Sequence, residues 1–191
     1  MIIWVSGTPG VGKTTVGKQL AKKLGYKFLD IPAFVKEARI GKRVGAADYL
    51  DVDLRILKQK LSQQVEDNTV VSGHLVVRLP RKQQKCIVLR RNPLKLAEGL
   101  KKRGYSMGKI VENVEAEFLG IVYDEAVKTF GRGRVYQVDT TGRKSFQITA
   151  NCLRIVRMAG VGDDVDWFRD LGKKELDRLL LFLARGRRVV L

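Results

Sequence analysis

The chain has 191 residues, of which 45% are hydrophobic and 30% charged, so it is long enough for one compact domain and too apolar to be disordered. Lysine and arginine number 37 against 20 aspartate and glutamate residues, which gives a net charge of +17. No stretch approaches the ~18 consecutive apolar residues that span a bilayer, so we expect no membrane segment.

The first 24 residues predict a strand, a loop and a helix in that order. The apolar run 2–5 predicts a strand, and apolar residues at helical spacing over 16–24 predict an amphipathic helix. Between them, GTPGVGKT (residues 7–14) fits G-x-x-x-x-G-K-[ST] without a mismatch. Since the motif has the strand and helix that it requires, we prefer a nucleotide triphosphate site to a chance match in a glycine-rich turn.

The residue types of this loop explain its chemistry. Glycines let the backbone wrap a phosphate with its N–H groups pointing inward, and the helix N-terminus adds partial positive charge. We expect Gly10, Gly12 and Thr15 to contribute to phosphate binding. Lys13 would reach the β- and γ-phosphates of ATP, and Thr14 would offer its hydroxyl to Mg²⁺.

The rest of the chain alternates between short strands and helices. Further strands are predicted at 27–31, 70–74, 85–89 and 135–139. Helices are predicted at 33–40, 51–66, 94–103, 109–127 and 145–158, with a glycine- and cation-rich loop at 41–45. This alternation predicts an α/β fold, a five-stranded mostly parallel sheet sandwiched by helices in the layout of a P-loop kinase.

The last part of the chain is predicted to be a helical extension, residues 160–191, behind a nucleotide kinase domain at 1–159. A hinge is expected at 159–162, followed by a helix over 165–184 whose apolar face packs on the domain or on a partner chain. The basic end at 185–188 is a candidate RNA contact. The two cysteines, Cys86 and Cys152, lie in apolar contexts, which favours buried reduced thiols and a cytoplasmic protein.

Four segments behind the phosphate loop carry a resemblance to a known family. They are LDVD at 50–53, VVSGHLVVRLP at 70–80, RGYS with Lys109 at 103–109, and ENVEAE at 112–117. In this order they resemble the archaeal and eukaryotic adenylate kinases of the isoenzyme 6 type, over most of residues 1–158. The resemblance implies a nucleoside monophosphate-binding region at 30–66 and a short lid at 103–109.

The same resemblance implies a function. It is phosphoryl transfer from ATP to AMP with broad specificity, ATP and Mg²⁺ as cofactors, an ATPase activity and a role in small ribosomal subunit maturation. The implied partners are AMP or a similar nucleoside monophosphate, and a small-subunit ribosomal protein or pre-rRNA. The net charge fits an RNA-containing partner and fits a solvated basic surface equally well.

Lys13, His74 and Arg103 are the predicted catalytic residues. Phosphoryl transfer depends on positioning and on cations around the transferred group, and Arg103 stands near the tip of the lid. Arg90 and Arg91 follow a strand, at the edge where α/β sites form. The alternative for any one arginine is a solvated charge.

His74 matches the family histidine that would orient an attacking water or adjust the metal shell. Its alternative is a strand-end histidine satisfied by hydrogen bonds. The resemblance also places the adenine near Gly142, in the loop after the last strand. Asp51 and Asp53 would contact AMP or a partner, or would only cap the helix that follows.

One position departs from the family, since Ser72 replaces the aspartate that the resemblance implies. A carboxylate there would hold the Mg²⁺ shell. Without it the ion would rely on Thr14, phosphates, water and Asp30, unless Asp30 is only a strand-end cap. The departure bears on turnover more than on nucleotide binding.

Two other functions fit the sequence. A cytidylate-type nucleoside monophosphate kinase shares the opening SGxPGxGKTT, and a weakly catalytic, ATP-dependent assembly or RNA-binding switch protein would fit Ser72. A GTPase is excluded because the sequence has no Asn-Lys-x-Asp signature. A shikimate kinase would need a glycine-rich triplet after the third strand, where this chain has SGHL at 72–75.

Overall fold

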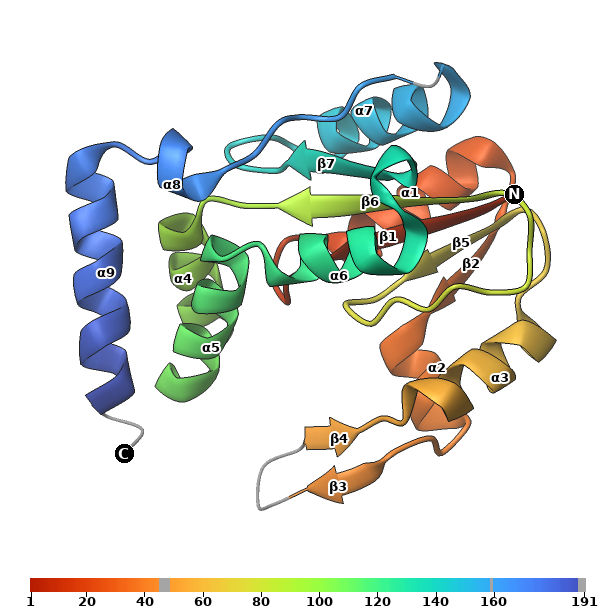
Figure 1. Ribbon diagram of the computed structural model, residues 1–191, viewed down its shortest axis with the longest axis horizontal. Coiled ribbons are helices and arrows are strands. Elements are labelled where there is room, and N and C mark those ends of the chain that lie inside the picture. Colours follow the sequence, from red (N-terminus) through yellow and green to blue (C-terminus); the bar gives the residue numbers. More distant parts are fainter. Residues whose placement is uncertain (45–48, 159, 189–191) are drawn as a thin grey trace.

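The computed structural model describes residues 1–44, 49–158 and 160–188, and its centre is a five-stranded parallel sheet (Figure 1). The strand order is β2-β5-β1-β6-β7, and all four neighbouring pairs are parallel. Their bounds are Ile2–Gly7 (β1), Lys27–Asp30 (β2), Thr69–Ser72 (β5), Gln84–Arg90 (β6) and Val135–Asp139 (β7). The predicted fold class is therefore confirmed.

Helices cover both faces of the sheet because the central strand buries its side chains in two directions. Ile3 and Val5 of β1 join one hydrophobic cluster, while Ile2 and Trp4 join the other. The helices on the first face are α1 (Lys13–Leu24), α4 (Pro93–Lys102), α5 (Met107–Phe118), α7 (Ser145–Met158), α8 (Trp167–Asp170) and α9 (Lys173–Arg188). Those on the second face are α2 (Ile31–Glu37), α3 (Leu54–Gln64) and α6 (Ile121–Phe130).

Two predicted helices are each divided in the structure. The helix expected over 109–127 is interrupted between α5 and α6 at Gly120, which has φ 69. A Cβ at this glycine would lie 3.8 Å from the guanidinium of Arg90, so the turn also brings the chain close to a buried side chain. The helix expected over 165–184 is divided into α8 and α9, because Leu171 adopts an extended backbone and buries its side chain.

The predicted loop at 41–45 contains a strand. Lys42–Val44 (β3) pairs antiparallel with Tyr49–Asp51 (β4), and the hairpin projects beyond α2 and α3 (Figure 1). Gly41 has φ 103, and a Cβ there would lie 2.8 Å from the Asp51 carbonyl oxygen, so a glycine allows this approach. Gly45 lies outside the described residues. The sequence missed the hairpin because strands of three residues are too short to show a period.

One of the two aspartates before α3 is the N-cap of this helix. The Arg55 N–H donates a 2.7 Å hydrogen bond to the Asp53 carboxylate, so Asp53 is the cap of α3. Along this helix Leu57 and Leu61 are fully buried, whereas Leu54 in its first turn is 48% exposed.

Residues 160–188, the described part of the predicted extension, pack on the rest of the chain. In α9, Leu179 and Leu183 are buried, and Gly186 lies so close to Val111 of α5 that a Cβ would meet that side chain. The predicted hinge begins at 159, outside the described residues. The residue that follows the predicted hinge is held to the sheet, because the Asp163 N–H donates a 2.8 Å hydrogen bond to the Gln137 carbonyl oxygen of β7. In the basic end at 185–188, the side chains of residues 187 and 188 lie outside the described part.

Both cysteines are free and buried, as predicted. Burial raises the pKa of the Cys86 thiol well above its usual range and that of Cys152 to about 12. Among the helices of the described ranges, none has the length and apolar character needed to cross a membrane.

Candidate functional site

The phosphate loop joins β1 to α1 at the carboxyl edge of the sheet. Gly7 has φ 139, and a Cβ there would lie 2.4 Å from the Leu89 carbonyl oxygen, so the loop leaves the sheet by a path that only glycine permits. Gly10 and Gly12 also have positive φ, 96 and 102. Because α1 begins at Lys13, its unpaired N–H groups and partial positive charge face the space enclosed by the loop.

Lys13 extends back over this loop. Its Nζ donates a 3.0 Å hydrogen bond to the Thr8 carbonyl oxygen. Burial lowers the pKa of Lys13 to about 8; the negative charges of Asp30 and Glu117 oppose this shift, and the positive charge of Arg103 adds to it. Lys13 and Arg103, predicted separately as catalytic, thus lie within electrostatic reach of each other.

The lowered pKa of Lys13 predicts a pH-dependent affinity for ATP. Below about pH 8 the ammonium is already present, whereas at higher pH binding of the polyphosphate must take up a proton. We expect the affinity to fall by up to about tenfold per pH unit above pH 8. Isothermal titration from about pH 7 to about pH 9.5 would measure it. Lys13→Arg should bind with little pH dependence, since arginine stays protonated, and an equal slope in this variant would contradict the assignment.

Thr14 and Asp30 are brought together at the start of α1. The Thr14 hydroxyl donates a 3.2 Å hydrogen bond to the Asp30 carboxylate. Asp30 also precedes α2, but its side chain makes no capping hydrogen bond, so the interpretation of Asp30 as a plain cap is wrong. Within the described residues, no group of three or more histidine, cysteine, aspartate and glutamate side chains could hold a metal ion. Thr15 is exposed on the same turn.

His74 lies just beyond β5, on the side of Lys13. Its backbone carbonyl accepts a 3.5 Å hydrogen bond from the Ser6 hydroxyl. Partial burial and, second, the charge of Lys13 lower the pKa of His74, so its ring is neutral at pH 7. In the described part of the chain the ring makes no hydrogen bond, which disfavours a histidine held only for structure.

Arg103 is the C-cap residue after α4 and begins a connection of four residues to α5. Gly104 has φ 74, and the Ser106 hydroxyl caps α5 by accepting a hydrogen bond of 3.4 Å from the Lys109 N–H. Arg103 is exposed. The predicted lid at 103–109 is therefore a tight helix connection plus the first turn of α5, with its arginine at the exposed corner.

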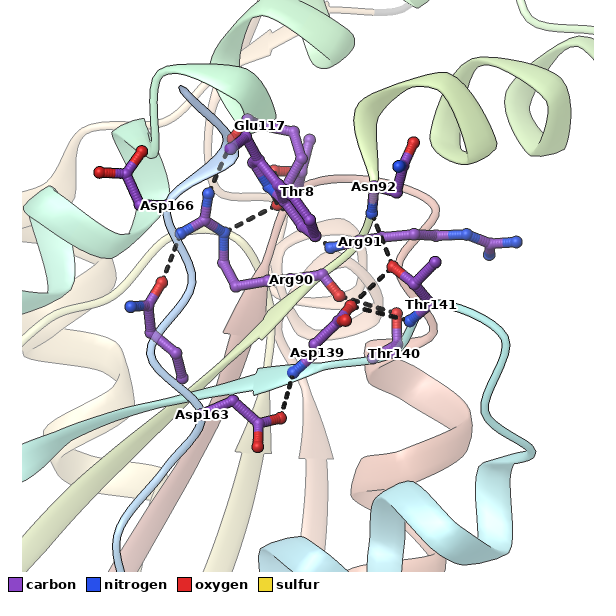
Figure 2. Close-up of polar contacts among 12 residues, drawn as sticks. Thr8, Arg90, Arg91, Asn92, Glu117, Asp139, Thr140, Thr141, Asp163 and Asp166 are labelled. Atoms are coloured by element: carbon purple, nitrogen blue, oxygen red, sulfur yellow. Dashed lines mark hydrogen bonds and ion pairs between the residues drawn. The ribbon is translucent and has the colours of Figure 1, made fainter. Parts of the chain in front are cut away.

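Arg90, one of the two arginines predicted at a strand end, is buried and fully engaged (Figure 2). Its Nε donates to the Glu117 carboxylate over 2.7 Å, and its Nη2 donates to the Glu117 carbonyl oxygen over 2.9 Å. The remaining Nη1 donates to the Gln137 side chain. Since each nitrogen already has a protein partner, Arg90 is neither a solvated charge nor a phosphate ligand.

Glu117 is the residue that sequence analysis missed. It is 2% exposed, and besides Arg90 its carboxylate accepts hydrogen bonds from the Thr8 hydroxyl (2.6 Å), the Trp167 indole (3.0 Å) and the Arg91 N–H (3.1 Å) (Figure 2). The phosphate loop, the end of β6 and α8 are thereby joined at one side chain. The sequence did contain a clue to its burial, because Glu117 lies at helical spacing among the apolar residues that α5 buries.

The loop after β7 contains Gly142, and hydrogen bonds fix the residues before it (Figure 2). Thr140 donates to the Arg90 carbonyl oxygen over 2.8 Å, through both its N–H and its hydroxyl. The Thr141 hydroxyl donates to Asp139 and accepts from the Asn92 N–H. Gly142 has φ 68 and stands at the same edge of the sheet as the phosphate loop. The predicted adenine contact near Gly142 stays a prediction.

A family model described as "AAA domain" matches residues 3–120. Among curated proteins, "Putative adenylate kinase" of Thermococcus onnurineus is 38% identical, covering 97% of this chain and 99% of that protein. The protein of the same name from Pyrococcus furiosus is 40% identical, covering 87% and 91%. The one from Saccharolobus solfataricus is 37% identical, covering 78% and 79%.

Solved structures resemble the chain in fold. A gluconokinase from Sinorhizobium meliloti aligns with a TM-score of 0.57 at 21% identity, covering 82% of this chain and 92% of that one. A shikimate kinase from Acinetobacter baumannii in complex with shikimate aligns with a TM-score of 0.57 at 16% identity, covering 81% and 92%. At these identities the likeness concerns the fold alone, which is that of P-loop kinases.

Proposed function

We propose an adenylate kinase activity on the premise that this chain belongs to the AAA-domain family and to the archaeal proteins named "Putative adenylate kinase". The chain is a nucleotide kinase. The reaction that we assign to it is transfer of the γ-phosphoryl group of ATP to AMP, with two molecules of ADP as products. Related nucleoside monophosphates would serve as weaker acceptors.

The observation that supports this proposal is that Lys13 extends back over the phosphate loop and lies within electrostatic reach of Arg103. The transferred phosphoryl group spreads charge over its equatorial oxygens, and cations on either side stabilise it. Lys13 and the loop N–H groups would bind the β- and γ-phosphates, and Arg103 would approach from the lid. The acceptor oxygen of AMP is already anionic near pH 7, so the step needs no general base.

We assign the parts of the chain accordingly. Residues 1–159 would act as the kinase domain, with AMP held by the region 30–66 and the lid at 103–109 closing over both nucleotides. Residues 160–191 would be a C-terminal helical extension, in which α9 packs against α5. Gly142 and its loop would contact the adenine of ATP.

Mg²⁺ would accompany ATP, and the donor chemistry at Thr14 fits this ion. Its hydroxyl lies 3.2 Å from a carboxylate oxygen, and Mg²⁺ prefers hard oxygen ligands combined with substrate phosphates. When bound, the ion would neutralise charge on the β- and γ-phosphates. Thr14 would hold it, and Lys13 would bind the same phosphates from the other side.

A coupled phosphotransfer assay with AMP, dAMP and CMP as acceptors tests the proposal. We expect ADP formation with AMP as the preferred acceptor. A clear preference for CMP would instead assign the chain to the cytidylate-type kinases. Tight ATP binding without transfer to any acceptor would favour a nucleotide-dependent switch protein.

We further propose an ATPase activity and a role in maturation of the small ribosomal subunit. The net charge of +17 and the isoenzyme 6-type segments support a ribosomal protein or pre-rRNA as partner. The neutral His74 ring, near Lys13, would orient the attacking water. We expect the unaltered chain to release ADP from ATP when no acceptor nucleotide is present. His74→Ala should lose this hydrolysis and still phosphorylate AMP. Equal hydrolysis by both proteins would remove His74 from this role.

A further inference from the structure

Ser72 ends β5 beside the phosphate loop, and its hydroxyl has no hydrogen-bond partner among the described residues. The parallel register places Ser72 next to Val5 of β1. The side chain is fully buried, and its Oγ makes no hydrogen bond to the described residues. A Cβ at Gly17 would lie 3.5 Å from the Ser72 Cβ, so this side chain faces α1. A residue at 72 thus points to the side of the sheet on which α1 begins, but serine brings no carboxylate there.

Asp30 is the neighbour of Ser72 on the adjacent strand, and it does bring a carboxylate. The parallel register of β2 and β5 pairs the two residues. Phe28 faces α1, since a Cβ at Gly17 would lie 2.8 Å from its ring. Side chains two residues apart in a strand share a face, so Asp30 also points toward α1. There its carboxylate accepts the 3.2 Å hydrogen bond from the Thr14 hydroxyl.

The direction of the Asp30 side chain is not explained by the helix that it precedes. Aspartate is a favoured N-cap, and Asp30 occupies the N-cap position of α2, yet its carboxylate accepts no capping hydrogen bond. Its negative charge also acts on Lys13, opposing the effect of burial on the pKa of that lysine. The carboxylate therefore lies within reach of both side chains that would meet the phosphates of ATP.

We propose that Asp30 provides the protein carboxylate of the Mg²⁺ site, from β2 in place of position 72 on β5. The inference rests on the proposed function, because the ion would bind together with ATP. Mg²⁺ is commonly held by one or two carboxylates plus substrate phosphates and keeps several waters. Asp30 and the Thr14 hydroxyl supply the protein share of such a shell, directly or through bound water.

Binding of Mn²⁺ tests the assignment without relying on turnover. The full chain is saturated with a non-hydrolysable ATP analogue, and free Mn²⁺ is followed by electron paramagnetic resonance. We expect Asp30→Asn to weaken Mn²⁺ binding by about 10- to 100-fold. The affinity for the analogue in EDTA should be unchanged or higher, because a negative charge beside the phosphates is removed.

Two controls separate the candidate positions. Ser72→Ala removes a hydroxyl that has no hydrogen-bond partner in the described part of the chain, and it should leave Mn²⁺ binding unchanged. Asp67→Asn removes an exposed carboxylate that pairs with the N-terminus and should behave in the same way. Circular dichroism would confirm folding of each variant, and if Asp30→Asn failed to fold, Asp30→Ser would carry the same measurement.

Unchanged Mn²⁺ affinity in the folded position-30 variant would overturn the proposal. A loss of Mn²⁺ affinity in Ser72→Ala but not in the position-30 variant would also overturn it. If the unaltered chain did not bind the analogue in EDTA, the proposed function would fail and this inference with it. Analogue binding without an effect at position 30 would overturn the inference alone.

Discussion

Glu117→Ala is expected to lower the free energy of unfolding by about 3–5 kcal/mol, the cost of leaving one member of a buried ion pair without its partner. Arg90, 3% exposed, would keep its charge inside the protein with only a carbonyl and an amide oxygen as acceptors. Thr8 and Trp167 would also lose an acceptor for a buried donor. Urea denaturation of both proteins would measure the loss.

The surface pair of Lys95 and Glu98 provides the matched control. Its charges lie 3.2 Å apart, but both side chains are about half exposed, so Glu98→Ala should cost no more than about 1 kcal/mol. The double variant Arg90→Ala/Glu117→Ala should lose less stability than the sum of its single variants, because each single variant leaves the other charge buried. If Glu117→Ala lowered the free energy of unfolding no more than Glu98→Ala does, Glu117 would not be the residue that holds these segments together.

Lys13→Ala is expected to reduce the rate of phosphoryl transfer by about 10²- to 10³-fold, as for removal of one preorganised donor from a charged transition state. The ATP affinity should fall as well. Since burial of the Lys13 ammonium lowers its pKa, this charge disfavours folding at pH 7, and the variant should be no less stable than the unaltered chain. Coupled assay and thermal unfolding on the same preparation would show both.

Lys23→Ala is the matched control for Lys13→Ala. Lys23 is an exposed lysine in the last turn of the same helix, far from the phosphate loop. Its loss should leave the rate unchanged within about twofold, as is usual for surface substitutions. If Lys13→Ala kept full activity, the phosphate loop would not be the active site, and the kinase assignment would fall.

The parts of the fold that sequence reasoning recovered are those in which local pattern and tertiary environment agree. The inner strands β1, β5 and β6 are short and mostly apolar runs, because a parallel strand covered on both faces must be apolar on both sides. The division of the helices at Gly120 and Leu171 was missed, since the apolar period continues across each break. At Gly120 the chain turns with a positive φ beside the buried Arg90 side chain, and at Leu171 the side chain enters the hydrophobic core. Neither tertiary contact can be read from a local sequence pattern.

For the charged residues, the sequence did not indicate which ones are buried in ion pairs. Sequence reasoning treated Arg90 as a possible site cation and Glu117 as one letter of a helix motif, whereas the two form a buried pair. Their separation along the chain leaves no periodic or local signal of contact. Asp30 and Ser72 are a similar case, because only the strand order β2-β5-β1 makes them neighbours beside the phosphate loop.

The sequence by itself determined the phosphate loop, the strand that leads into it and the helix that follows. That was possible because the loop acts through backbone N–H groups, whose geometry depends on glycines a few residues apart. Only the tertiary structure decided which charges are buried in pairs and which face the loop. Those outcomes depend on burial and on distances between segments remote in sequence: Glu117 closes against Thr8 and Arg90, and Asp30 reaches Thr14.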